Sequence, residues 1–229
     1  MAIATPALYR STVGKKAVMA LTGAVLVLFL LAHMVGNLKV FLGASDFNHY
    51  AAWLRTVGEP ALPGRWLLTA TEVILTTSVV LHMWSAVSLA KKAYDARPVR
   101  YAARKKAHAN GYAVHTMRYG GVVIALFVIW HLLDLTFGAI NPAGHGAAPY
   151  DKVIADFTPE RWYITVFYVA AVIMVGLHLR HGIRSAFQTL GLATHRSYAS
   201  YNLLAAAVSI VLTVGFLAVP LAVTFGWVK

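Results

Sequence analysis

Apolar residues gather in five long stretches separated by polar segments, and this alternation dominates the chain. The stretches cover about residues 17–40, 66–90, 119–140, 162–186 and 201–227. A bilayer core about 30 Å thick needs roughly 20 apolar residues per helix, and each stretch meets that length. The pattern therefore predicts an all-α integral membrane protein, an antiparallel bundle of five transmembrane helices.

The segments between the stretches are too short to form a soluble domain. The longest is 91–118, and the segments 43–65 and 141–161 are rich in Gly, Pro and Asn, which is typical of loops. We therefore expect one membrane domain spanning 1–229, with no dicarboxylate site on this chain. Any soluble catalysis would belong to a partner protein.

Composition supports a membrane protein and removes several kinds of site. Hydrophobic residues make up 59% of the chain and charged residues 12%, about half the charged fraction of an average soluble domain. There are no cysteines, so disulfides, thiolate metal sites and iron–sulfur ligation by this chain are excluded. We expect neither an iron–sulfur cluster nor FAD on this chain.

The formal charge of +12 is unevenly distributed along the predicted topology. With the N-terminus in the cytoplasm, most of the basic residues fall on the cytoplasmic side, many of them within 91–118. The positive-inside rule therefore favours a cytoplasmic N-terminus and an external C-terminus, in the cell inner (cytoplasmic) membrane. Because no nucleic-acid module is present, membrane lipid headgroups and an acidic cytoplasmic partner explain the basic face better than nucleic acid does.

Four of the ten histidines are distinguished by their depth in the apolar stretches, one in each of the first four: His33, His82, His131 and His178. Ionisable groups at this depth are costly, usually face the bundle interior, and pair with one another or hold a cofactor. A single such histidine would more often be a hydrogen-bonded packing residue. One per helix across four helices favours cofactor ligation.

The depth of each histidine predicts how the four pair. At 1.5 Å per residue, His33 and His131 lie roughly 20–25 Å from the cytoplasmic face, and His82 and His178 roughly 9–14 Å. Two imidazoles on facing helices can hold one heme iron between them. The sequence therefore predicts two b-type hemes at two levels, the outer held by His33 and His131 and the inner by His82 and His178.

Other polar residues in the spans have less specific interpretations. Heme propionates require cations, and Arg118 and Arg184 lie at the cytoplasmic ends of the third and fourth stretches, although snorkelling to lipid headgroups explains them equally well. His181 lies three residues after His178 and competes with it as a ligand. Glu72 and Asp134 are carboxylates within the spans that could be hydrogen-bonded inside the bundle.

Three segments carry a resemblance to a known family: HMVGNLKVF (33–41), MRYGGVVIALFVIWHLLDLT (117–136) and LHLRHGIRSAFQTLG (177–191). They resemble the cytochrome b membrane-anchor subunit of succinate dehydrogenases and fumarate reductases, in its single-chain, five-helix, di-heme, menaquinone-linked form. In this family the ligand on the fourth helix precedes a glycine by four positions, which selects His178 through Gly182. The resemblance assigns the axial ligands to His33, His82, His131 and His178, and it also matches Arg118.

The resemblance implies a role in respiratory electron transfer. Electrons from succinate would pass through a flavoprotein subunit and an iron–sulfur subunit on the cytoplasmic face, and then through two heme b groups to menaquinone. It also allows fumarate reduction by the reverse flow, and a higher oligomer of the complex. One position departs from some relatives, which carry a glutamate, proposed to pass protons, where this chain has Gly176.

Three other functions remain as alternatives. A cytochrome b anchor of another dehydrogenase, such as a hydrogenase or formate dehydrogenase, would also contain membrane histidines. A proton-coupled transporter would use the histidines as a relay, but it predicts a continuous polar path that these helices barely provide. A purely structural anchor would keep the histidines without heme.

Overall fold

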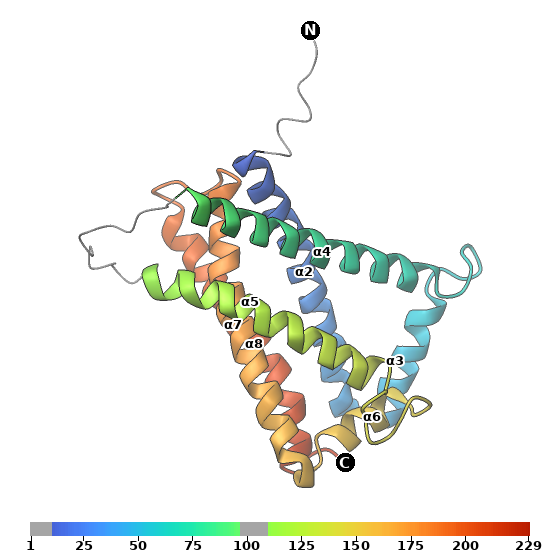
Figure 1. Ribbon diagram of the computed structural model, residues 1–229. Helices are drawn as coiled ribbons and strands as arrows, with labels where there is room; N and C mark the ends of the chain where they lie inside the picture. The colour runs from blue at the N-terminus through green and yellow to red at the C-terminus, as the bar shows by residue number, and fades with distance from the viewer. Residues whose placement is uncertain (1–10, 97–109) are drawn as a thin grey trace.

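The computed structural model describes residues 11–96 and 110–229 (Figure 1), and within these ranges the ordered elements are helices without strands. Five helices are long and apolar enough to cross a membrane, as the sequence predicts. They are α2 (Thr12–Leu38), α4 (Trp66–Asp95), α5 (Asn110–His131), α7 (Trp162–Thr189) and α8 (Tyr198–Thr224).

Helix α2 is central to the bundle, because it packs against α4, α7 and α8. Helices α7 and α8 form the most extensive pair, and α5 packs on α7. In Figure 1 the C-terminus lies at the end of the bundle where α2 and α5 finish and α7 begins. We call this end of the bundle the C-terminal end and the opposite end, where α2 begins, the N-terminal end.

The two connections predicted as loops contain helices, which corrects the sequence-based expectation. Helix α3 (Ala44–Thr56) occupies part of 43–65, after a 3₁₀ turn over Lys39–Leu42, and helix α6 (Pro149–Asp156) occupies part of 141–161. Proline at the first position of α6 favours helix initiation. Helices α3 and α6 pack against each other and close the C-terminal end of the bundle.

The third membrane helix ends at Thr136, before the predicted limit of 140. After His131 the chain forms one π-helical turn, Leu132–Thr136. Gly138 then adopts a left-handed backbone with φ of 71°, and a Cβ there would lie 2.6 Å from the Gly144 carbonyl oxygen. Only glycine fits this reversal of the chain. After it, Asn141 contacts Asp134 in the π-helical turn that follows α5.

Helices α7 and α8 approach closely at Gly176. The Ser209 hydroxyl donates a 2.6 Å hydrogen bond to the Gly176 carbonyl, and a Cβ on Gly176 would collide with the Thr213 hydroxyl. Small residues at such a crossing let helix backbones meet in a membrane. Gly176 therefore has a packing role in this chain.

Candidate functional site

The His33 and His131 rings meet between α2 and α5. Their centroids are 5.9 Å apart, with the rings nearly perpendicular at 88°. Aromatic side chains surround the pair: Phe29 stacks on His33 at 5.1 Å, and Tyr168 of α7 lies 6.1 Å from His131. Nδ1 of His131 is buried without a hydrogen-bond partner in the described part of the chain.

The His82 and His178 rings form a second pair, between α4 and α7. Their centroids are 6.2 Å apart and the rings are tilted by 58°. The structure thus brings together the same two pairs that helix depth predicts. Nδ1 of His178, like that of His131, is buried without a partner among the described residues.

The surroundings of His82 indicate which ring nitrogen carries its proton. Nδ1 lies 3.0 Å from the Met19 carbonyl and 3.3 Å from the Thr22 hydroxyl. A carbonyl oxygen can only accept, so Nδ1 carries the proton and Nε2 keeps its lone pair. An imidazole fixed in this way is typical of a metal ligand, whose other nitrogen donates to a backbone carbonyl.

Glycines near the two pairs differ in what surrounds them. A Cβ on Gly23 would lie 3.3 Å from the His82 ring, whereas one on Gly121 or Gly182 would have no neighbour within 4 Å. The Gly36 position faces the Tyr50 ring instead. Gly121 and Gly182 therefore leave open space, Gly23 allows α2 to approach His82, and Gly36 and Gly176 serve helix packing.

Of the two predicted propionate arginines, the structure describes the side chain of Arg184 alone. Its guanidinium carbon lies 5.6 Å from the centre of the Tyr198 ring, and its Nε is buried without a hydrogen-bond partner among the described groups. Arg118 lies in α5, but its side chain falls outside the described residues. A buried guanidinium nitrogen without a partner is suited to an anionic group.

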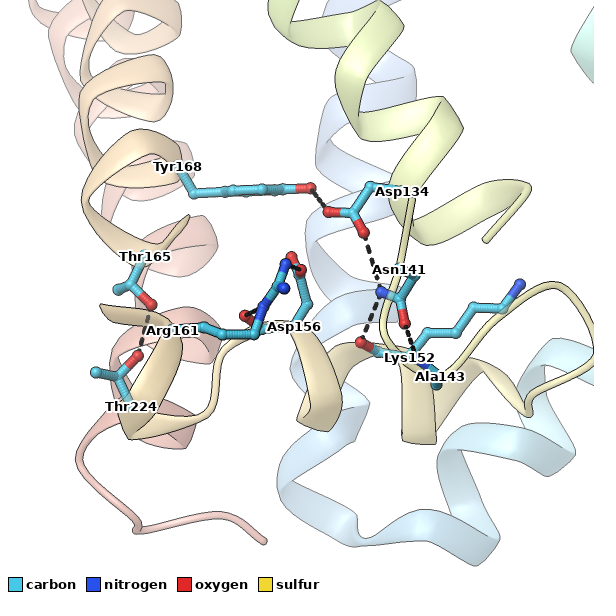
Figure 2. A network of polar contacts seen from close by, with 9 residues as sticks. All are labelled: Asp134, Asn141, Ala143, Lys152, Asp156, Arg161, Thr165, Tyr168 and Thr224. Atoms are coloured by element: carbon cyan, nitrogen blue, oxygen red, sulfur yellow. Dashed lines mark hydrogen bonds and ion pairs between the residues drawn. The ribbon is translucent and has the colours of Figure 1, made fainter. Parts of the chain in front are cut away.

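A buried polar network lies beside the His33–His131 pair (Figure 2). The Asp134 carboxylate accepts hydrogen bonds of 3.0 Å from the Tyr168 hydroxyl and from the Asn141 amide, and Asn141 also donates to the Lys152 carbonyl. Asp134 is 1% exposed and Asp156 is 0% exposed. Asp156 Oδ1 forms a 2.9 Å ion pair with Arg161.

This network contains two buried carboxyl groups, and Arg161 forms an ion pair with one of them, Asp156. Burial, followed by the hydrogen bond and charge of Asp134, raises the pKa of Asp156 to about 7, although Arg161 lowers it. Asp156 Oδ2 has no hydrogen-bond donor among the described side chains. The arrangement therefore favours a proton on Asp156 near neutral pH.

The sequence analysis identified Asp134 but missed Asp156, Asn141 and Tyr168 as its partners. Asp156 lies in a segment predicted as a loop. Asn141 and Tyr168 lie 7 and 34 positions after Asp134 in the sequence, so no local sequence pattern links these residues to Asp134. Glu72, the other predicted carboxylate, is exposed on the surface of the bundle, and its carboxylate lies 3.5 Å from the guanidinium of Arg65, the residue before α4. It does not contribute to the buried network.

Comparison with known proteins places the chain in a family. No curated protein and no solved structure matches it. A family model described as the succinate dehydrogenase/fumarate reductase transmembrane subunit matches residues 95–216, just over half of the chain. This region includes α7 with His178, and His131 at the end of α5. The chain therefore belongs to the family of succinate dehydrogenase/fumarate reductase transmembrane subunits.

Proposed function

We propose that this chain is the cytochrome b membrane anchor of a succinate:menaquinone oxidoreductase and holds two b-type hemes. His33 and His131 would ligate one heme iron, and His82 and His178 the other. The observation that carries the proposal is the meeting of two imidazole pairs from four different helices, at 5.9 Å and 6.2 Å. Bis-histidine b hemes, when bound, supply one-electron carriers without an open coordination position.

The separations of the ring centres fit this donor set. An imidazole nitrogen lies about 2.0 Å from a metal it ligates, so two imidazoles that hold one ion must be close neighbours, as the two rings of each pair are. Among the described residues, no three or more His, Asp or Glu side chains gather around a common metal position. This arrangement agrees better with two histidines holding each metal ion than with three or more protein side chains holding one.

The chain's own residues would orient and insulate the carriers. The Met19 carbonyl and Thr22 fix the His82 ring, and Phe29 and Tyr168 enclose the other pair. Arg184 would bind a propionate at the N-terminal end. An apolar surrounding of this kind limits the charge rearrangement that accompanies electron transfer.

Charge distribution supports the orientation that we propose. In the sequence, the segment 91–118 between the second and third apolar stretches carries the largest cluster of basic residues, so the end of the bundle where α4 ends would face the cytoplasm and a flavoprotein and an iron–sulfur subunit. The His82–His178 pair would then hold its heme nearer the electron-donating subunits, and the His33–His131 pair would hold the other heme farther from them. The same arrangement permits fumarate reduction with the opposite direction of flow.

The partner assignment can be tested on the complex isolated from membranes through a tag on this chain. We expect a flavoprotein and an iron–sulfur subunit to co-purify, and succinate to reduce the b-type absorbance. Reduction by hydrogen or formate but not succinate would instead indicate an anchor of another dehydrogenase. Absence of both co-purifying subunits would contradict the proposal.

Gly23 provides a specific test of the inner site. Replacement by valine places methyl groups against the His82 ring, because the Cβ alone would already lie 3.3 Å from it. We expect Gly23→Val to lose the inner heme and retain the outer one, measured by low-temperature reduced-minus-oxidised spectra. Ala24→Val, at the neighbouring exposed position, should retain both, and equal losses in the two variants would contradict this role for Gly23.

A further inference from the structure

The Asp134–Asp156 carboxyl pair is the most unusual buried feature outside the histidine sites. Asp134 comes from the π turn after α5 and Asp156 from the last residue of α6. Figure 2 draws both, Asp134 joined to Tyr168 and Asn141 and Asp156 joined to Arg161, and the charge of Asp134 acts on Asp156. Isolated buried carboxylates are strongly disfavoured, so two adjacent ones require compensating donors or a proton.

The hydrogen-bond donors around the pair are too few to stabilise both carboxyl groups in their ionised form. Asp134 accepts from Tyr168 and Asn141, and Asp156 Oδ1 accepts from Arg161. Asp156 Oδ2 is left buried without a partner, beside the other carboxyl. A proton shared between the two carboxyls supplies the missing hydrogen bond and leaves one negative charge opposite Arg161.

Other charged and titratable groups near the pair do not supply that missing donor. Lys152 directs its ammonium toward the Thr136 carbonyl, 3.4 Å away. Tyr168 already donates to Asp134, and the His131 ring, 6.1 Å from the Tyr168 ring, forms no hydrogen bond to either carboxyl among the described residues. Arg161 is 25% exposed at its side chain, so it connects the buried pair to water at the C-terminal end.

We infer that the Asp134–Asp156 pair is a proton-binding site whose occupancy is coupled, through Tyr168, to the charge held between His33 and His131. This inference rests on the proposed function, because it requires a heme between His33 and His131. When one electron from the succinate-oxidising partner makes that level more negative, the pair binds its proton more tightly. A larger fraction of pairs then holds the shared proton, which comes from water at the C-terminal end, and the added negative charge is partly compensated inside the bundle.

The sign of the coupling follows from electrostatics and linkage. An extra electron near the pair disfavours a second carboxylate charge, so reduction raises the proton affinity of the pair and protonation favours reduction equally. The midpoint potential of the outer centre should therefore fall as pH rises through the range near pH 7, where the pKa of Asp156 lies. The change expected is about fivefold in affinity, or about 40 mV for a one-electron couple.

Asp156→Asn tests the coupling, because asparagine keeps the shape and leaves Asp134 as the single charge. Spectroscopic redox titrations of the whole complex should show an outer potential that no longer depends on pH and matches the wild-type value at low pH. The potential of the His82–His178 centre should not change. Asp151→Asn, which removes an exposed charge from the same short helix, is the matched control and should behave as wild type.

Proton retention can be measured without any redox partner. Infrared spectra of the complex near neutral pH should contain a carboxylic-acid band that shifts in heavy water and disappears in Asp156→Asn. Absence of that band in the wild type would overturn the shared proton. Its presence together with a pH-independent wild-type outer potential would overturn the coupling alone.

The two proposals fail in different ways. A complex without heme would refute the cytochrome function, whereas the infrared band would still report on the carboxyl pair. If Asp156→Asn does not assemble, Tyr168→Phe provides a second test, since it removes the hydroxyl that donates to Asp134 and keeps the ring beside His131. It should reduce the pH dependence of the outer potential and keep the infrared band, and an unchanged pH dependence would contradict the coupling.

Discussion

His131→Ala is expected to remove one of two hemes from each chain and to leave the other spectroscopically unchanged. His131 and His33 meet at 5.9 Å, and a heme iron that loses one of two protein ligands is held far less tightly. His33→Ala should therefore give the same spectrum as His131→Ala. We expect heme content, measured as the pyridine derivative, to fall from about two to about one per chain.

The two remaining ligand variants should form a second class. His82→Ala and His178→Ala should lose the inner heme and keep the outer one. His145→Ala, at an exposed loop position, is the control for a general effect of losing histidine and should retain both hemes. If His33→Ala and His82→Ala lost the same heme signal, the proposed pairing of the histidines would be contradicted.

Gly176→Val is expected to be the most destabilising single change in the α7–α8 pair. A Cβ at this position collides with the Thr213 hydroxyl, and the Ser209 hydrogen bond holds the two backbones at that distance. Overpacking of this kind costs typically about 1–3 kcal/mol. We expect a lower thermal unfolding midpoint for the detergent-solubilised complex, with loss of the inner heme on heating before the outer one, because His178 lies two residues away.

A matched substitution separates crowding from added volume. Ala170→Val lies on the same helix at an exposed position and should leave the midpoint nearly unchanged. Gly176→Val combined with Thr213→Ala should recover part of the loss, since the second change removes the hydroxyl that obstructs the Cβ. Equal midpoints for Gly176→Val and Ala170→Val would show that the crossing at Gly176 tolerates a side chain.

The sequence was informative about features that repeat along single helices. Five apolar stretches predicted five membrane helices, and the positions of four histidines within them predicted which rings meet, because a helix converts sequence position directly into depth. The short helices α3 and α6 were missed, since their amphipathic character and turn residues resemble those of a loop. Their stability comes from packing against each other at the C-terminal end.

The polar network was beyond sequence analysis for a physical reason. Asp134 could be recognised because a carboxylate in a membrane span is rare, but its partners are fixed by the chain reversal at Gly138, which no helical periodicity encodes. Gly23 was missed because its role depends on a ring from another helix. Gly176 was noted only as a departure from relatives that carry a glutamate there, because its packing against Thr213 involves a second helix.

Heme stoichiometry of the purified complex tests the central claim most directly. The measurement is a dithionite-reduced minus oxidised spectrum with heme quantified per copy of this chain. The account predicts two b hemes per chain, one for each histidine pair. One heme would mean that one of the pairs is not a ligand set, and none would contradict the cytochrome assignment and favour a transporter or a heme-free anchor.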